Sequence, residues 1–378
     1  MSEQYIQYGA EVSLFSGKTR AYMRYKAIPF TETLATANVV NHLLYPNTGM
    51  RMIPVVKAPD GEFLQDTTTI IDTLEKRFPQ HSVYPESPTQ KLIAMLLELY
   101  ADEWLLLPAM HYRWHYKRSH LWFILNEFGA SAMPGWPKAL QPFAGLLPAF
   151  YFGKMYKPVL GISRKNRAAV EHWYEAFLGF FNTHLEQHAY LLGGRPSIAD
   201  FGFIGPLYAH LYRDPYSGRL MKRLAPNVSN WVERMMRGDA PVGDFVADDQ
   251  IPETLLPILS HMLNTQYPVL RESVKRVAKK AKENPEQRLP RFLGKMTYQL
   301  SDIEEQRYVN SYAQWMLQRP IHHYQNLDGV SRQQVDDWLA ANSMQALVDI
   351  DISQWIEKRE NKLFPAQPVL GGSRPDGS

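Results

Sequence analysis

The chain has 378 residues, of which 45% are hydrophobic and 21% are charged, and its formal net charge is +3. This length and composition predict two or three globular domains rather than a disordered chain. The small net charge gives no reason to expect a nucleic-acid partner. No apolar stretch reaches the roughly 20 residues that cross a membrane, so membrane contact is not the expected role.

Cysteine is absent from the sequence. Disulfide bonds, thiolate metal sites, a catalytic cysteine and a redox dithiol are therefore excluded. Any thiol used by the protein must arrive with a ligand. The lack of disulfides, together with an N-terminus that has no basic stretch followed by an apolar core, predicts a cytoplasmic protein.

Residues 1–80 are predicted to form an α+β domain that alternates short strands with helices. Strands are expected at 5–8, 31–34, near Pro54 and at 63–64, and helices at 15–26, 39–44 and 66–78. The order β-α-β-α-β-β-α predicts a mixed sheet covered by helices. A linker at 79–88 with three prolines ends this domain.

Residues 88–245 are predicted to form an all-helical domain, because 91–115 and 167–187 carry apolar residues at helical spacing. Between them, 121–162 is rich in aromatic residues, proline and glycine, and predicts broken helices. Packing against the neighbouring helices is the expected role of this segment, and a flap over a substrate or a membrane contact is the alternative. Ser197-Ile198-Ala199-Asp200 has the spacing of a capping box before a buried helix.

Residues 251–370 are predicted to form a mainly helical C-terminal extension, after a linker at 238–252. Helices are expected at 253–282, 308–317 and 331–342. The basic residues on the first of these are interpreted as a solvated face. Residues 371–378 are predicted to be a disordered tail.

The most informative segment runs from Ile53-Pro54 through Asp60-Gly61 to Asp66-Thr67. Proline is tolerated at the first residue of a strand, and an X-Pro bond can be cis at modest cost. Asp-Gly predicts a hairpin turn. The helix that starts after the second strand presents free N–H groups, which suit an anionic ligand. From the residues alone, two interpretations remain open. The segment is either an ordinary hairpin followed by a capped helix or a ligand-binding edge.

Taken together, these residues resemble the glutathione S-transferase family. The resemblance is carried by 15–30 as the first helix and its exit, 53–56 as the cis-proline strand, 60–67 as the glutamate-binding turn, and 197–200 as the capping box of the core helix. It covers about residues 5 to 240. It implies a thioredoxin-like domain that holds glutathione, a helical domain that completes an apolar pocket for a small electrophile, and a homodimer.

The resemblance places the hydroxyl that activates the glutathione thiol at Ser13, with Ser16 as the second choice and Tyr8 as the third. A thiol of pKa near 8.5 is only a few per cent thiolate at pH 7. A hydroxyl that donates to a charged acceptor contributes about 1.5–3 kcal/mol, and a helix N-terminus adds about 0.3–1 kcal/mol. The alternative for Ser13 is a plain N-cap. Neither serine belongs to a Ser-His-Asp pattern, so a serine hydrolase is not expected.

The remaining glutathione contacts are implied at Ile53, Pro54, Asp66, Thr67, Arg51 and His42. The Ile53 backbone is expected to pair with the cysteine unit, and Asp66 and Thr67 to hold the γ-glutamyl end. Arg51 or His42 is expected to reach the glycine carboxylate. The chain departs from the family pattern at Met52, where many members carry Lys, and at Asp66, which replaces the commoner Glu.

The helical domain is expected to line the second-substrate pocket with Tyr100, Trp104, His111 and Tyr112. His111 and His115 have the spacing of a helical metal pair, but a packed helix is preferred and no metal site is predicted. Two functions remain open. One is a transferase that promotes attack of the glutathione thiolate on an apolar electrophile, and the other is a non-catalytic module of the same fold.

Overall fold

We describe residues 4–367 of a computed structural model, apart from the side chains of residues 117 and 118. The N-terminal part contains β1 (Tyr5–Gly9), α1 (Leu14–Tyr25), β2 (Phe30–Leu34), α2 (Ala37–Val39), the π-helical turn η1 (Val40–Leu44), α3 (Tyr45–Thr48), β3 (Val55–Lys57), β4 (Phe63–Gln65) and α4 (Thr67–Arg77). The strand order is β2-β1-β3-β4. β1 runs parallel to β2, whereas β3 is antiparallel to both β1 and β4. This mixed sheet confirms the predicted α+β class with a thioredoxin-like domain.

The helical part contains α5 (Pro88–Glu103), α6 (Leu106–His115), α7 (Lys117–Ala132), α8 (Gln141–Leu160), α9 (Arg167–Gln187), α10 (Ile198–Pro206), the π-helical turn η2 (Leu207–Tyr212), α11 (Pro215–Leu224) and α12 (Pro226–Arg237). Helix α10 is buried at every residue. Its capping box is confirmed, because the Ser197 N–H donates to Asp200 Oδ2 at 2.9 Å while the Ser197 side chain accepts from the Asp200 N–H. The Asp200 carboxylate also accepts from Leu191 and Trp231, so this cap ties three segments together.

The C-terminal extension contains the 3-10 turn η3 (Glu253–Leu255), α13 (Leu256–Thr265), α14 (Tyr267–Glu283), β5 (Phe292–Leu300), β6 (Ile303–Asn310), α15 (Ser311–Gln325), α16 (Gly329–Ala341), the 3-10 turn η4 (Gln345–Leu347), β7 (Ile356–Arg359) and β8 (Lys362–Pro365). The single helix predicted over 253–282 was wrong, because a new helix begins at Tyr267 with a proline in its first turn. The helix predicted from 308 was also wrong at its start, because Asn310 caps α15 from the end of β6. The hairpins β5–β6 and β7–β8 were not predicted. The tail 371–378 lies outside the described residues.

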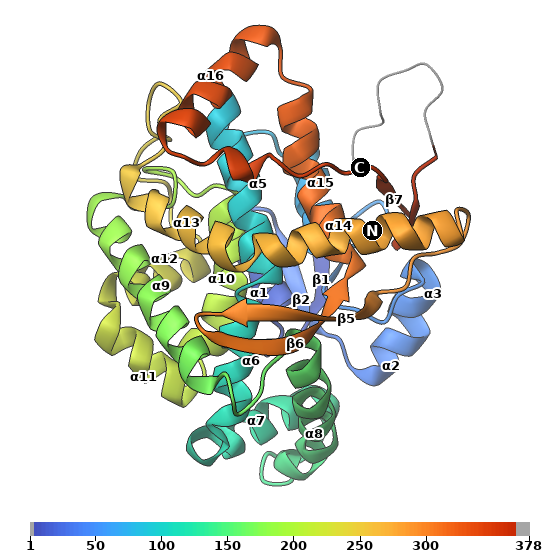
Figure 1. The fold of residues 1–378 in the computed structure, drawn as a ribbon. Coiled ribbons are helices and arrows are strands. Elements are labelled where there is room, and N and C mark those ends of the chain that lie inside the picture. The colour runs from blue at the N-terminus through green and yellow to red at the C-terminus, as the bar shows by residue number, and fades with distance from the viewer. Residues whose placement is uncertain (1–3, 368–378) are drawn as a thin grey trace.

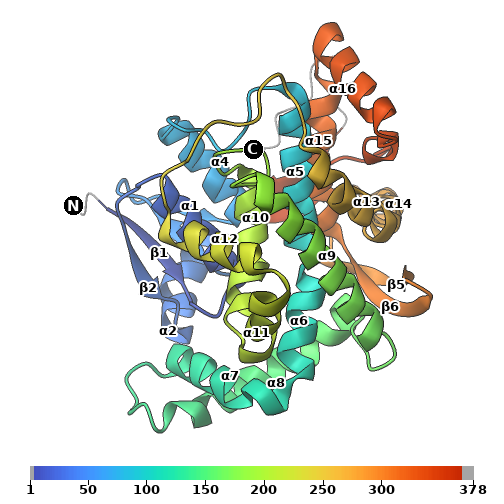
Figure 2. The ribbon, with the colours of Figure 1, turned by 90° about the vertical axis from the view of Figure 1, so that its left-hand side faces the viewer.

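The extension wraps around the junction of the two other parts, and α15 lies beside α5 (Figures 1 and 2). Arg319 of α15 donates to Glu98 of α5 at 2.7 Å and to Asp72 of α4 at 3.0 Å. One contiguous hydrophobic core runs through all three parts, from Tyr5 to Ile356. None of the helices in the described residues has the length and apolar character that a membrane crossing needs.

Candidate functional site

One edge of the thioredoxin-like sheet gathers the predicted site residues. β3 is antiparallel to β1, so the start of β3 at Val55, directly after Pro54, lies beside the end of β1. β4 is antiparallel to β3, so Asp66 follows β4 at this same edge. α1 and α4 both begin here, after Ser13 and Asp66 respectively. The edge therefore combines two helix N-termini, whose partial positive charge favours an anion.

Ser13 is the N-cap of α1. Its Oγ accepts from the Ser16 N–H at 3.3 Å, and its side chain is half-buried. The cap uses an acceptor lone pair of the hydroxyl and leaves the hydroxyl proton to donate elsewhere. The predicted N-cap is therefore real, and it is compatible with a donor role for Ser13.

The alternative hydroxyls sit differently. Ser16 is fully buried, and its Oγ accepts from the Ala10 N–H at 3.3 Å. A Cβ on Gly9 would lie 2.8 Å from that oxygen, so Ser16 fills the space against β1. Tyr8 is 7% exposed, and burial raises the pKa of its phenol. Of the three residues, Ser13 is the least buried.

Asp66 closes the β4–α4 turn, with a positive φ of 82° that non-glycine residues seldom adopt. Its Oδ1 accepts from the Thr68 N–H at 3.1 Å and from the Thr69 N–H at 3.4 Å. The preceding Ile53–Pro54 bond is cis, as the family resemblance implies. Thr67 is buried at the first position of α4. Oδ1 is thus committed to capping the helix.

The other oxygen of Asp66 is covered by the C-terminal extension. Oδ2 accepts from the Tyr312 hydroxyl at 2.6 Å and lies 3.5 Å from Lys358 Nζ. The ammonium of Lys358 also donates to Thr69 Oγ1 at 2.9 Å and lies 4.0 Å from the centre of the Trp315 ring. Burial lowers the pKa of Lys358, and Asp66 opposes that change. Sequence reasoning missed both partners, because no local pattern links them to Asp66.

Arg51 and His42 lie in the β2–β3 connection that follows the same sheet edge, and both are exposed. The Arg51 guanidinium stacks on Tyr45, with its central carbon 3.9 Å from the ring centre, and donates to Asn41 at 3.1 Å. Both side chains therefore lie in the connection that leaves this edge of the sheet and returns to it.

The helical domain faces the start of α1 through η2. The Tyr208 hydroxyl donates to Glu11, and His210 Nε2 lies 3.2 Å from the Val12 carbonyl oxygen. Arg213 donates to the carbonyl of Glu11 at 3.2 Å. These side chains were not singled out in the sequence. Their only sequence signal is that they follow the capping-box helix directly.

The four residues expected to line a second-substrate pocket are buried in the helical domain. Tyr100, Trp104, His111 and Tyr112 are each no more than 1% exposed. Tyr100 packs against Trp173 and Phe177, and Tyr112 against Tyr174, within the aromatic core of the helical domain. Aromatic residues at helical spacing are compatible with a core as well as with a pocket lining. Here they form part of the core.

His111 and His115 face each other, with their Nδ1 atoms 2.7 Å apart. His111 Nε2 lies 2.9 Å from Glu171, which also accepts from Tyr116 at 2.8 Å. Burial lowers the pKa of His115 to about 4. Within residues 4–367, no group of three or more His, Asp or Glu side chains is arranged to hold a metal ion. The pair is thus part of a packed polar cluster.

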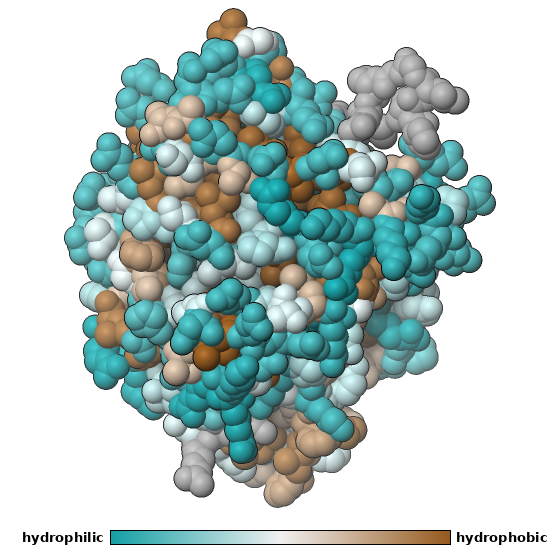
Figure 3. Space-filling view, viewed as in Figure 1, coloured by the Kyte–Doolittle hydropathy of each residue, from teal (hydrophilic) through white to brown (hydrophobic). Residues whose placement is uncertain are grey.

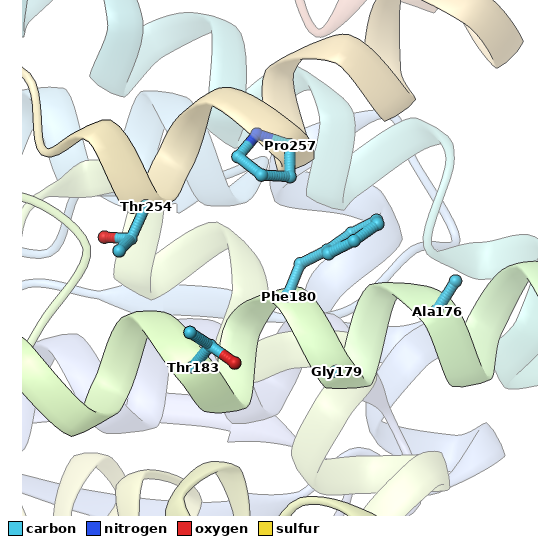
Figure 4. A pocket seen from close by; sticks show the side chains of 6 residues that line it. All are labelled: Ala176, Gly179, Phe180, Thr183, Thr254 and Pro257. Atoms are coloured by element: carbon cyan, nitrogen blue, oxygen red, sulfur yellow. The ribbon is translucent and has the colours of Figure 1, made fainter.

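A shallow apolar cavity of about 420 Å³ lies elsewhere, between α9 and the start of α13 (Figure 4). It is lined by Ala176, Gly179, Phe180, Thr183, Thr254 and Pro257. None of these residues belongs to the sheet edge, so the cavity is separate from the Ser13 site.

Comparison with known families agrees with this architecture. The glutathione S-transferase N-terminal domain matches residues 8–82, and the glutathione S-transferase C-terminal domain matches residues 167–234. With both domains present in this order, the chain belongs to the glutathione S-transferase family. The extension after residue 234 lies outside both matches. A search of curated proteins found no match.

Solved structures similar to the chain have low identity. A GST-like protein from Pseudomonas syringae is 19% identical, with 64% of this chain and 69% of that one covered and a TM-score of 0.40. Beta-etherase LigF from Sphingobium sp. strain SYK-6 is 16% identical over 61% and 94%, with a TM-score of 0.44. Rice GST1 in complex with glutathione is 16% identical over 63% and 88%, with a TM-score of 0.40. The family assignment rests on the two domain matches.

Proposed function

We propose that the protein is a glutathione transferase of the serine type, which activates the glutathione thiolate for attack on a small, largely apolar electrophile. One observation carries this proposal: Ser13, the cis Ile53–Pro54 bond and the Asp66-capped start of α4 converge on one edge of the sheet. Family membership supplies the ligand class. The cysteine-free sequence requires that the reactive sulfur belong to that ligand.

In this proposal, the Ser13 hydroxyl donates to the glutathione sulfur and favours its anion, while the thiol proton passes to solvent. The sulfur lone pair then forms a C–S bond with the electrophilic carbon, and the leaving group departs with its bonding electrons. The Ile53 backbone and Thr67 position the peptide. Arg51 or His42, both exposed in the β2–β3 connection, is proposed to reach its glycine carboxylate. Tyr208 and Arg213 stand where the second substrate would approach.

A second candidate, a non-catalytic binding module, is favoured by a specific observation. The Asp66 carboxylate already carries Tyr312 and Lys358 on Oδ2 and two amide donors on Oδ1. A γ-glutamyl ammonium must therefore share or displace an ammonium that belongs to the chain itself. If displacement is too costly, the extension holds the site closed and the fold serves as a scaffold.

Calorimetric titration with glutathione and with S-methylglutathione tests the proposal. We expect both ligands to bind, and we expect turnover of chlorodinitrobenzene as a generic electrophile. Binding without turnover of a panel of electrophiles supports the second candidate. No binding at millimolar ligand removes glutathione from the site. The proposal also includes a homodimer and a cytoplasmic location. Light scattering in the same buffers tests the homodimer.

A further inference from the structure

We propose that the α7–α8 hairpin is a docking surface for an anionic lipid bilayer, which it enters at the interface without crossing. The hairpin lies at the end of the molecule opposite to α16 (Figures 1 and 2). Arg213 joins this hairpin to the start of α1, because it contacts both Glu127 of α7 and Glu11. The inference concerns the outer, solvent-facing surface of the hairpin and does not depend on the proposed transferase activity.

The hairpin concentrates the exposed apolar surface of the protein. Of fourteen large hydrophobic side chains that are exposed among the described residues, ten lie between 121 and 151. They are Leu121, Trp122, Met133, Trp136, Leu140, Phe143, Leu146, Leu147, Phe150 and Tyr151. Brown and tan atoms gather over this end of the molecule in the space-filling view (Figure 3). A contiguous exposed patch of this kind marks an interaction surface.

The packing inside the hairpin is the reverse of that in a water-facing helix pair. The closest approach of α7 and α8 is at small residues: a Cβ on Gly145 would lie 2.1 Å from the Leu125 carbonyl oxygen, and one on Gly129 would lie 1.8 Å from that of Gln141. One aromatic pair, Phe128 and Phe152, also stacks between the two helices. Ala149 is also buried there, while Leu147 is 77% exposed and Phe150 is 68% exposed. Small residues between helices and large apolar residues outside are the arrangement that lipid favours.

The charge around the hairpin selects an anionic partner. Residues 117–160, which form α7, α8 and the turn between them, contain five Lys and Arg residues and one acidic residue, whereas the rest of the chain contains 36 basic and 37 acidic residues. The one acidic residue, Glu127, is paired with Arg213 at 2.7 Å. Lys138 and Lys154 are exposed beside the aromatic residues. A second copy of the hairpin would set these like charges against each other, whereas anionic head groups would neutralise them.

The composition of the patch suits an interface and not a bilayer centre. Trp122, Trp136 and Tyr151 combine an apolar ring with a polar atom, which is why such residues gather at head-group depth. Lys154 lies 5.8 Å from the centre of the Phe150 ring, so its stem follows the apolar surface while its charge stays outside. The hairpin therefore fits a shallow position in the plane of the membrane.

Vesicle sedimentation with the full chain tests this proposal. We expect the protein to bind vesicles of phosphatidylcholine with 30% phosphatidylglycerol, because anionic head groups attract nearby basic residues. Binding to pure phosphatidylcholine should be at least ten-fold weaker. The double variant Leu147→Ser, Phe150→Ser should lose at least ten-fold in binding. Lys154→Glu should lose several-fold, and added salt should weaken binding of the wild type.

Matched controls are available at Val330 and Val242, which are 82% and 71% exposed and lie outside the hairpin. Val330→Ser and Val242→Ser should bind anionic vesicles like the wild type. Because all these positions are exposed, circular dichroism and melting temperature should confirm that each variant is folded. Failure to bind either vesicle, or wild-type binding by the double variant, overturns the proposal. The proposal is also overturned if the wild type forms a dimer in solution that the double variant dissociates and the wild type does not bind vesicles.

Discussion

The Tyr312 hydroxyl donates a 2.6 Å hydrogen bond to Asp66 Oδ2 across 246 positions of the chain. Asp66 also caps α4, so the extension and the start of a family-defining helix share one carboxylate. Burial, and then the charge of Asp66, raises the pKa of Tyr312 well above its usual value, so the phenol remains a donor at all physiological pH values. The extension is thereby built into the candidate site.

Replacing Lys358 with methionine should tighten glutathione binding about three- to ten-fold. The substitution removes a cation 3.5 Å from the carboxylate that the γ-glutamyl ammonium needs, and like charges repel across such distances even at an effective dielectric constant near 20. Calorimetry on the wild type and the variant measures the change. Lys358→Arg keeps the charge and should bind like the wild type. Weaker binding by Lys358→Met would instead mean that Lys358 contacts the ligand favourably.

Replacing Ser13 with alanine should raise the pKa of the bound thiol by about one to two units, because a hydroxyl donor to a charged acceptor is worth about 1.5–3 kcal/mol. Turnover at pH 7 should fall about 10–100-fold. The variant should also lose about 1 kcal/mol of stability, since Ser13 caps α1. Ultraviolet titration of the thiolate provides the pKa.

The matched control for Ser13 is Asp328→Ala, which removes the N-cap of α16 far from the sheet edge. It should lower stability without changing the pKa of the bound thiol. A Ser13→Ala variant with wild-type turnover would remove Ser13 from the proposed role and leave it as a helix cap.

Replacing Arg319 with methionine should cost about 1.5–3 kcal/mol, because the buried carboxylate of Glu98 loses a charged hydrogen-bond donor at 2.7 Å while it keeps its ion pair with Lys18. Asp72 loses its partner as well. Urea unfolding measures the change, and limited proteolysis should cut the linker at 238–252 faster. Arg332→Met is the control. Its pair with Asp336 is solvent-exposed, so it should cost less than about 1 kcal/mol. Equal effects of the two substitutions would contradict the docking role of Arg319.

Replacing Gly145 with alanine should destabilise the protein by about 1–3 kcal/mol, because the new Cβ meets the Leu125 carbonyl oxygen at 2.1 Å and forces α7 and α8 apart. Gly135→Ala, in the turn between them, has no neighbour within 4 Å of the new Cβ and should change stability by less than about 0.5 kcal/mol. Differential scanning calorimetry of the two variants makes the comparison.

Replacing Glu103 with glutamine should flatten the pH dependence of stability. Burial, and then the carboxylate of Asp102, raises the pKa of Glu103 from 4.5 to about 7. The folded state therefore holds a proton that the unfolded state releases, so this group is most favourable to folding below pH 4.5 and that benefit is lost as the pH rises to about 7. Across that window the wild type should lose about 1–3 kcal/mol relative to Glu103→Gln. A constant difference between pH 5 and pH 7.5 in urea unfolding would refute this assignment.

Local chemistry is what made much of the fold predictable. The capping box at Ser197 and the helix start after Asp66 depend on side chains within three residues of the backbone groups they satisfy. The turn at Asp60-Gly61 and the apolar strand after Pro54 are equally local. These patterns placed every element of the thioredoxin-like sheet.

The unpredicted features depend on distant partners or on weak signals. β5–β6 turns through Ser301, which adopts a φ of 55°, instead of a recognisable Asn-Gly turn. The contacts of Asp66 with Tyr312 and Lys358 join side chains that no spacing rule connects. The aromatic residues Tyr100 and Tyr112 look the same in sequence whether they line a pocket or fill a core, and only the packing of α9 against them decides.

The contacts at Asp66 also set an order of assembly during synthesis. The sheet edge is complete once residue 77 has been made, but Tyr312 and Lys358 follow hundreds of residues later. At roughly 5–20 residues per second, that interval lasts about 15–60 seconds. A nascent chain therefore presents Asp66 uncovered before the finished protein covers it, and a ligand of that carboxylate would meet its least hindered target while the protein is still attached to the ribosome.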